Sequence, residues 1–304
     1  MRRLPVVGVV VVVVTATLSA FGASVARGSA PSAGSDAAHE VGLKDFDSAK
    51  FPAEARVDNE WFPLIPGSEL VLEGRSTIEG KRGKHEIIAT VTDLTKVIDG
   101  VRTAVVWERD VSRGQILESE IYFSAQDVDG NVWLFGEYPA EYEDGKFARA
   151  PDVWIGGVDG ARPGVTMRAD PQTGTSAYLQ GLAPAVEFKD KAKVARTGMH
   201  NCVPFDCFDD VLLIKESAPL EPKEGFQLKY YAPGVGNIRV GAQGGKQQEV
   251  LVLADVRRID AAGMAEARAA ALDLEAHAYE GSKVYTDTSP LESCTAEGQC
   301  TPAA

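Results

Sequence analysis

The sequence has few of the residues that usually carry catalysis. Only four histidines occur among its 304 residues. They are spread along the chain as His39, His85, His200 and His277. Neither the H-E-x-x-H metal motif nor the G-x-S-x-G nucleophile motif is present. Carboxylate pairs such as Glu118 and Glu120 are common in so acidic a chain and do not indicate a glycosidase. These absences favour a noncatalytic protein.

The sequence also lacks a long apolar run after its first thirty residues. The single run of membrane length, over residues 4–20, follows two arginines and precedes small residues at 22–26. This order is typical of a secretory signal peptide, so we assign residues 1–30 to a signal peptide. An uncleaved membrane anchor is the alternative interpretation. We therefore expect a secreted, extracytoplasmic protein with no membrane span after cleavage.

Basic residues are too few to balance the acidic ones. The chain has 31 lysines and arginines against 44 aspartates and glutamates, which gives a formal net charge of −13. A surface of this sign repels nucleic acid and anionic lipid headgroups, so no nucleic-acid partner is predicted. It attracts cations, although solubility is a sufficient explanation for the charge.

Cysteine is scarce, but its count is even. Cys202, Cys207, Cys294 and Cys300 all lie in the mature part of the chain. An even number of cysteines in an exported protein predicts two disulfides, with three possible pairings, of which the two local ones are the simplest. A zinc site with His200 is the alternative. The C-x4-C and C-x5-C spacings are wider than those of most structural zinc sites.

The remaining sequence is organised as one β-rich domain between two polar segments. Residues 31–50 read as a disordered linker, 51–280 as a single domain with a C-terminal helix, and 281–304 as a flexible tail. Between Ser68 and Val256, apolar and polar residues alternate and are interrupted by turn pairs such as Asp-Gly. We therefore predict a mainly β fold, an antiparallel meander that forms a curved sheet or half-barrel.

Two smaller features complete this architecture. The segment 58–67 combines bulky apolar residues with two prolines, so we expect an extended arm laid onto the core. Helical spacing occurs between Asp260 and Glu280, where apolar residues fall three and four positions apart. These residues are Met264, Ala267, Ala271, Leu274 and Ala278.

One loop has the composition of a cation site. Asp127, Asp129 and Asn131 occupy alternate positions, so their oxygens could converge on calcium. Compared with an EF-hand loop, the glycine comes too early and the twelfth position is not acidic, and an ordinary hairpin turn explains the same residues. We predict no cofactor, with calcium as the weaker alternative. A metal-dependent hydrolase using Asp127, Asp129 and Asp159 is the corresponding enzymatic hypothesis.

Aromatic residues suggest a binding surface. Trp133 and Phe135 lie in one predicted strand, Trp154 precedes a glycine-rich loop, and Tyr230 and Tyr231 precede a Pro-Gly turn. We predict that these five side chains line the concave face of the sheet and bind a small apolar or amphipathic ligand without catalysis. An envelope structural or interaction protein, with a protein partner on the sheet face, is a further alternative.

Four sequence blocks support this interpretation by resemblance. They are QDVDGNVWLFGE, VWIGGVDGARPGV, CFDDVLLIKESAPLEP and KYYAPGVGNIRV. Together they resemble an uncharacterised family of exported bacterial proteins that share the patterns QDxDGNVWxFGE, GVDGAxPG, FDDxLxxKE and YYAPGVG, over the region from Trp61 to Leu274. The resemblance implies a β-rich extracytoplasmic domain closed by a C-terminal helix and supplies no catalytic residues. This chain departs from the pattern at its cysteines, which suggests added disulfides.

Overall fold

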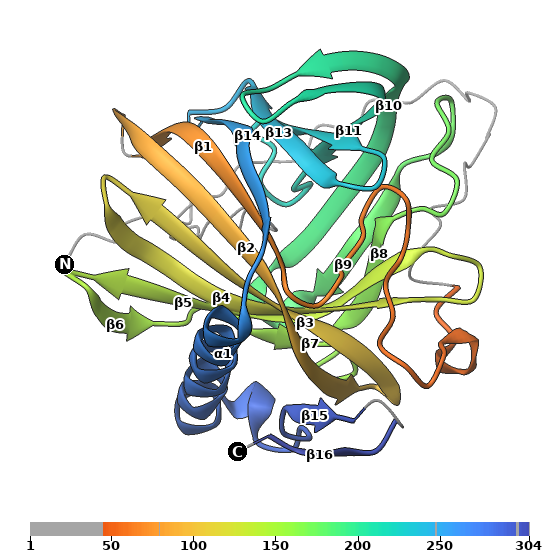
Figure 1. The fold of residues 1–304 in the computed structure, drawn as a ribbon, viewed down its shortest axis with the longest axis vertical. Coiled ribbons are helices and arrows are strands. Elements are labelled where there is room, and N and C mark those ends of the chain that lie inside the picture. The colour runs from red at the N-terminus through yellow and green to blue at the C-terminus, as the bar shows by residue number, and fades with distance from the viewer. Residues whose placement is uncertain (1–44, 79, 247, 296–297, 304) are drawn as a thin grey trace, which may run out of the picture.

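The computed structural model describes residues 45–304 apart from 79, 247, 296–297 and 304. The predicted signal peptide and most of the predicted linker therefore lie outside the described residues. Twelve antiparallel strands form the body of the molecule (Figure 1). In chain order they are β1 (Ser68–Ile78), β2 (Lys81–Ile98), β3 (Val101–Ser112), β4 (Gln115–Gln126), β5 (Val132–Glu143), β8 (Arg162–Met167), β9 (Tyr178–Ala183), β10 (Phe188–Cys202), β11 (Cys207–Ser217), β12 (Phe226–Ala232), β13 (Gly236–Gln243) and β14 (Gln248–Arg258).

Shorter elements surround these strands. They are the 3₁₀ turns η1 (Ser48–Lys50), η2 (Pro184–Val186) and η3 (Lys283–Tyr285), the strands β6 (Lys146–Arg149), β7 (Trp154–Ile155), β15 (Glu292–Cys294) and β16 (Cys300–Pro302), and the helix α1 (Ala261–Gly281). The strands β6 and β7 pair with β5, whereas β15 pairs with the second half of β2 and carries β16 beside it.

The sheet closes on itself. Strand β1 pairs with β14 on one side and with β2 on the other, so Leu72 lies opposite both Leu253 and Ile87. The mainly antiparallel β fold with a C-terminal helix is confirmed, but the predicted half-barrel is wrong, because the structure is a full barrel. Closure satisfies the backbone donors and acceptors that β1 and β14 would otherwise expose at open edges.

Local sequence explains the hairpins. At Asp99-Gly100, both residues have positive φ, 49° and 78°, and the same holds for Arg113-Gly114, at 53° and 80°. Two successive positive φ values define the type I′ turn, whose twist matches that of the strands it joins. The predicted turn at Asp144-Gly145 has the same geometry, with φ of 51° and 73°.

The helix α1 covers the outside of the barrel over β2 to β5. It begins where the Asp260 carboxylate accepts a hydrogen bond from the backbone N–H of Gly263, at 2.9 Å. Its buried face includes Ala267, Ala271 and Leu274, as the helical spacing predicted. The following tail, predicted to be flexible, contains the fully buried Tyr285 and Leu291 and is packed against the core.

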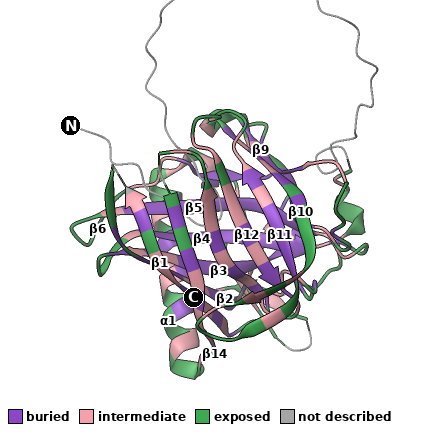
Figure 2. Cartoon of the chain, turned by 90° about the horizontal axis from the view of Figure 1, so that it is seen from above, coloured by how far each residue is buried: buried purple, intermediate pink, exposed green. Residues whose placement is uncertain are grey.

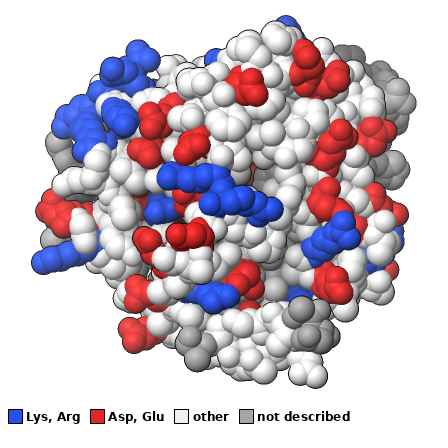
Figure 3. Space-filling view, viewed as in Figure 1, with Lys and Arg blue, Asp and Glu red and all other residues white. Residues whose placement is uncertain are grey.

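Most buried residues lie in the strands, and they include more acidic side chains than the net charge alone would suggest. Figure 2 shows buried residues along the barrel strands and exposed ones on loops and on α1. Acidic and basic side chains are mixed over the face in Figure 3, with basic ones gathered at upper left, over the ends of β1 and β2. Thirteen of the described acidic residues are buried, against only two lysines and no arginine. A substantial part of the acidic side chains therefore lies inside the molecule.

Candidate functional site

The barrel interior brings together carboxyl groups from strands all around the wall. They are Glu108 and Asp110 on β3, Glu118 and Glu120 on β4, Glu137 on β5, Asp190 on β10, Glu216 on β11 and Glu249 on β14. All are buried. Aspartate and glutamate are rarely buried unless paired, so a concentration of this size marks the interior as the candidate site.

The carboxyl groups of β3 and β4 face one another. Glu108 lies opposite Glu120, and Asp110 lies opposite Glu118. Burial, and then the nearby Glu108 and Glu141, raises the pKa of Glu118 to about 8. The pKa of Glu120 is raised well above its ordinary value by burial, with Glu108 and Glu118 adding to the effect. Because opposed carboxylates repel each other, protons are retained in this part of the barrel at neutral pH.

A buried histidine links two more of these groups. His85 is fully buried, with Nδ1 3.3 Å from Oδ1 of Asp110 and Nε2 2.7 Å from Oε1 of Glu249. The side-chain N–H of Gln227 donates to the other oxygen of Glu249, at 3.1 Å. Burial raises the pKa of Asp110, and the charges of Glu249 and Glu118 raise it further. The imidazole ring of His85 therefore lies between two buried carboxyl groups.

One lysine enters the site from the opposite wall. Lys229 lies 2.8 Å from Oε2 of Glu216, and Gln180 donates to Oε1 of the same carboxylate at 2.9 Å. Lys229 also lowers the pKa values of Glu120 and Asp190, yet burial keeps both above their ordinary values. The Lys229 ammonium group therefore pairs with Glu216 and also acts electrostatically on Glu120 and Asp190.

A cavity of about 80 Å³ lies beside these polar groups. Its walls are mainly apolar, from Leu70, Leu72, Ile87, Val91, Val106 and Leu134. Its polar lining includes Glu108, Lys229, Gln180 and Thr166. The Thr166 hydroxyl is buried and has no hydrogen-bond partner among the described residues. The cavity therefore combines an apolar surface with a hydroxyl group that is available for a hydrogen bond to a ligand.

The predicted arm closes this cavity, where Phe62 and Leu64 contribute to the lining. Asn59 holds the arm in place: its side-chain N–H donates to the carbonyls of Gly130, at 2.9 Å, and Arg168, at 3.2 Å. Its side-chain oxygen accepts from the backbone N–H of Phe62, at 3.1 Å. The arm is thus fixed at the barrel wall by specific hydrogen bonds.

The structure separates the predicted aromatic lining into two faces. Leu134 lines the cavity, so its neighbours Trp133 and Phe135 point to the opposite face of β5. There Phe46 and Phe51 cover them, with ring centroids 5.9 Å from Phe46 to Trp133 and 5.4 Å from Phe51 to Phe135. Trp133 and Phe135 therefore do not line the cavity, and their covering segment begins inside the predicted linker.

The other three predicted aromatic residues also have different surroundings. Tyr231 lines the cavity and packs beside Phe62, with ring centroids 6.2 Å apart. Trp154 is buried and stacks on Phe188, at 5.0 Å. Tyr230 precedes Tyr231 on β12 and so faces outward, with the Arg239 guanidinium 6.0 Å from its ring. Of the five, only Tyr231 is placed at the cavity.

The predicted calcium loop uses its carboxylate as an internal cap. Oδ1 of Asp127 accepts from the backbone N–H groups of Asp129, at 3.0 Å, and Asn131, at 2.8 Å. Its Oδ2 accepts from the indole N–H of Trp133, at 2.8 Å. The Asp129 side chain is 61% exposed and lies 3.5 Å from Lys50. The Asp127 carboxylate, with the Asn131 side chain that donates to it at 3.0 Å, stabilises the turn, as in the hairpin interpretation.

The hydrolase hypothesis required three carboxylates to meet. Asp159 lies in the turn before β8, with φ of 49°. Among the described residues, Asp127, Asp129 and Asp159 do not form a group of ligand atoms within 4.8 Å of one another. The geometry does not favour a metal-dependent mechanism at these residues.

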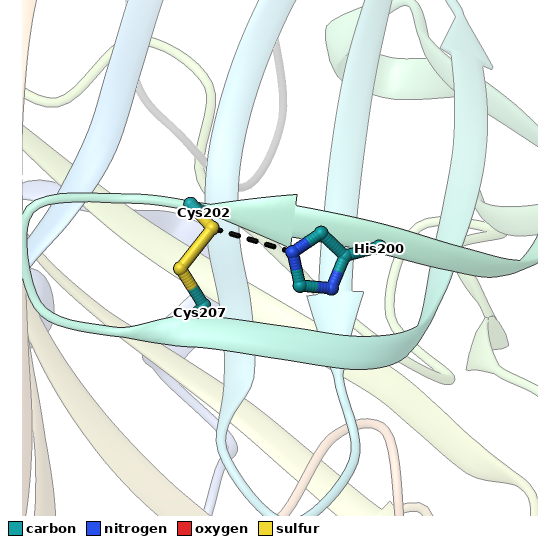
Figure 4. Close-up of side chains that lie close together, drawn as sticks. All are labelled: His200, Cys202 and Cys207. Carbon is teal, nitrogen blue, oxygen red and sulfur yellow. Dashed lines mark hydrogen bonds between the residues drawn. A yellow bond between two sulfur atoms is a disulfide. The ribbon is translucent and has the colours of Figure 1, made fainter.

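The cysteines form the two local disulfides, Cys202–Cys207 and Cys294–Cys300. His200 lies beside the first, with Nε2 3.4 Å from Sγ of Cys202 (Figure 4). Sulfur in a disulfide is not a thiolate, so this group is not a zinc site while the bond is intact. The pairing is consistent with an extracytoplasmic location.

Sequence reasoning missed most of this site. The spacing of Glu118 and Glu120 indicates a carboxylate pair but does not connect it with Glu108, which lies in the neighbouring strand. The available signal was the order Val106-Trp107-Glu108, in which an acidic residue shares a strand face with an apolar one.

Comparison with known proteins gives two solved structures of limited similarity and no family. No protein-family model and no curated protein matches the chain. The structure is similar to a "putative exported protein with YmcC-like fold" from Bacteroides fragilis NCTC 9343, at 15% identity and a TM-score of 0.39, covering 65% of this chain and 99% of that one. It is also similar to a "putative lipoprotein" from Parabacteroides distasonis ATCC 8503, at 14% identity and a TM-score of 0.35, covering 66% of this chain and all of that one. No helix within the described residues has the length and apolar character to cross a membrane.

Proposed function

We propose that this protein binds a small amphipathic ligand inside its barrel, without catalysis. The observation that carries the proposal is the cavity, whose walls are mainly apolar but include the polar side chains of Glu108, Thr166 and Lys229. Ligand sites are typically apolar surfaces with a few placed polar groups. The signal-peptide pattern and the two disulfides support an extracytoplasmic setting for this binding.

The cavity limits the size of the ligand. Its volume of about 80 Å³ is roughly half of the ~150 Å³ that accommodates benzene in a protein core. In the same proportion, a ligand, or the part of it that enters the cavity, has about three non-hydrogen atoms. A longer chain would have to displace Phe62 and Leu64 of the arm.

Titration with straight-chain primary alcohols tests this proposal. Affinity should rise about fourfold for each added methylene, because burying one methylene group contributes about 0.8 kcal/mol to the binding free energy. The rise should stop once the cavity is full. Nuclear magnetic resonance titration measures both the affinity and the residues that shift, and those should include Tyr231 and Val106.

A matched pair of variants locates the ligand. Ala89→Leu adds side-chain volume at the cavity wall and should abolish binding, whereas Ala270→Leu adds the same atoms on α1 and should not. Both alanines are partly buried against apolar neighbours, so the two changes are comparable. Equal binding by both variants, or a purified protein that never retains or takes up an amphiphile, would refute the proposal.

A further inference from the structure

We propose that the polar group of the ligand is a cation, specifically an alkylammonium group that binds among the carboxyls around Glu108. This inference rests on the proposed function and adds the chemical class of the ligand. Its basis is the juxtaposition of an apolar cavity with an interior that has many more acidic than basic groups.

The neighbourhood of Glu108 is acidic on its own strand and on the next. Glu108 reaches the cavity itself. Glu120 lies opposite it on β4, and Asp110 and Glu118 form the next opposed pair. One oxygen of Glu120 and Oδ2 of Asp110 are buried without a hydrogen-bond partner among the described residues, while Oδ1 of Asp110 lies 3.3 Å from Nδ1 of His85. These oxygens are acceptors when ionised, so the site favours a donor that carries positive charge.

The cation already present does not remove this preference. Lys229 lies within 2.8 Å of Glu216, and Gln180 holds the same carboxylate from the other side. An anionic ligand would have to compete with Glu216 for Lys229 and would lie near Glu108. An ammonium ligand keeps the Lys229–Glu216 pair intact. The Thr166 hydroxyl oxygen at the cavity wall, which has no partner within the described part of the chain, can accept a hydrogen bond from the ammonium group.

Binding of a cation should release a proton. At neutral pH the raised pKa values keep protons on carboxyls such as Glu120. An ammonium group placed beside them favours the ionised form, so a carboxyl loses its proton to solvent while the ammonium keeps all of its own. Total charge is conserved, because the incoming positive charge replaces the proton that leaves. An alcohol brings no charge and gives no such release.

Calorimetry with three ligands of one chain length tests the inference. Butylammonium, butanol and butyrate are titrated into the wild-type protein at pH 7 in two buffers of different ionisation enthalpy. Butylammonium should bind at least about tenfold more tightly than butanol, which corresponds to one charge-assisted hydrogen bond. Its measured heat should depend on the buffer and report release of up to about one proton.

Two variants assign the effect to a residue. Glu108→Gln removes the carboxyl at the cavity and should lower the preference for butylammonium over butanol about tenfold. Glu69→Gln is the matched control, because Glu69 is also buried but contacts Thr90 and Arg109 instead of lining the cavity. It should keep the preference. The proton release in the wild type tests the inference even if a variant fails to fold.

The outcomes separate the two proposals. If butanol or butyrate binds as tightly as butylammonium, or if no proton is released, the cation inference is overturned and the proposed binding function stands. If none of the three ligands binds, both are overturned. A loss of ammonium preference in Glu69→Gln equal to that in Glu108→Gln would also overturn the assignment to the cavity.

Discussion

The acidic interior should make the protein less stable as pH rises, and Glu118→Gln should reduce this effect. The folded pKa of Glu118 lies above its ordinary value of 4.5, at about 8. The folded state therefore holds a proton that the unfolded chain gives up between these values. By linkage, stability is highest below about pH 4.5 with respect to this group and is lost as pH rises toward 8.

The change can be estimated from the pKa. A difference between 4.5 and about 8, at about 1.36 kcal/mol per pKa unit, corresponds to roughly 5 kcal/mol. Glutamine resembles the protonated carboxyl in shape and does not ionise. We therefore expect Glu118→Gln to match the wild type near pH 4 and to be more stable by several kcal/mol at pH 8.

Urea unfolding with the disulfides intact, followed by tryptophan fluorescence at pH 4, 6 and 8, measures this difference. The exposed Glu54→Gln is the control and should shift all three values by less than about 0.5 kcal/mol. Some decline with pH should persist in Glu118→Gln, because Glu120 and Asp110 also have raised pKa values. The reasoning fails if wild type and variant lose stability in parallel, or if the wild type gains stability from pH 5 to 8.

Three further substitutions test contacts that stabilise the barrel outside the cavity. Asp127→Ala should cost about 3 kcal/mol of unfolding free energy in urea titration, because it leaves the Trp133 indole N–H and backbone donors unpaired, whereas Asp127→Asn should cost less. Lys96→Ala should cost about 3–5 kcal/mol in the same assay by leaving Glu275 buried and unpaired, and adding Glu275→Gln should recover part of this loss. Phe51→Ala should uncover Trp133, lowering the thermal midpoint and moving tryptophan emission to longer wavelength; unchanged emission would contradict the packing.

Local features of the fold were predictable because short segments determine them. The turn at Asp99-Gly100 follows from residues that tolerate positive φ. The helix α1 follows from apolar spacing after an aspartate cap. The disulfide between Cys202 and Cys207 joins residues only five positions apart, at the end of one hairpin. In each case the relevant contacts lie within a few residues along the chain.

Closure of the barrel depends on contacts that no local pattern contains. Ser68 pairs with Arg258, and Thr77 pairs with Gln248 at the other end of the same two strands. Alternation in β1 and β14 identifies each as a strand but says nothing about which strands become neighbours. Bulges, such as the one after Val71, also shift the register in ways that the sequence does not indicate.

The charged interior was missed for a related reason. Alternation shows which residues share a face of a strand but not which face is inside the barrel. In β3, Val106 and Glu108 share the cavity face, while Trp107 and Arg109 share the outer face, where the guanidinium lies 3.9 Å from the indole ring. An expectation that polar residues point outward assigns Glu108 to the wrong side.

The burial of acidic residues also changes how the net charge should be interpreted. A formal charge of −13 predicts a uniformly repulsive surface, but many of the acidic groups are enclosed by the barrel wall. Their mutual repulsion and burial favour protonation, so they contribute less negative charge to the surroundings than their number suggests. Charges at a surface are screened within about 10 Å by salt, whereas charges in the interior are screened much less. Selection by charge should therefore be strongest inside the cavity beside Glu108, and its dependence on ionic strength should be weak.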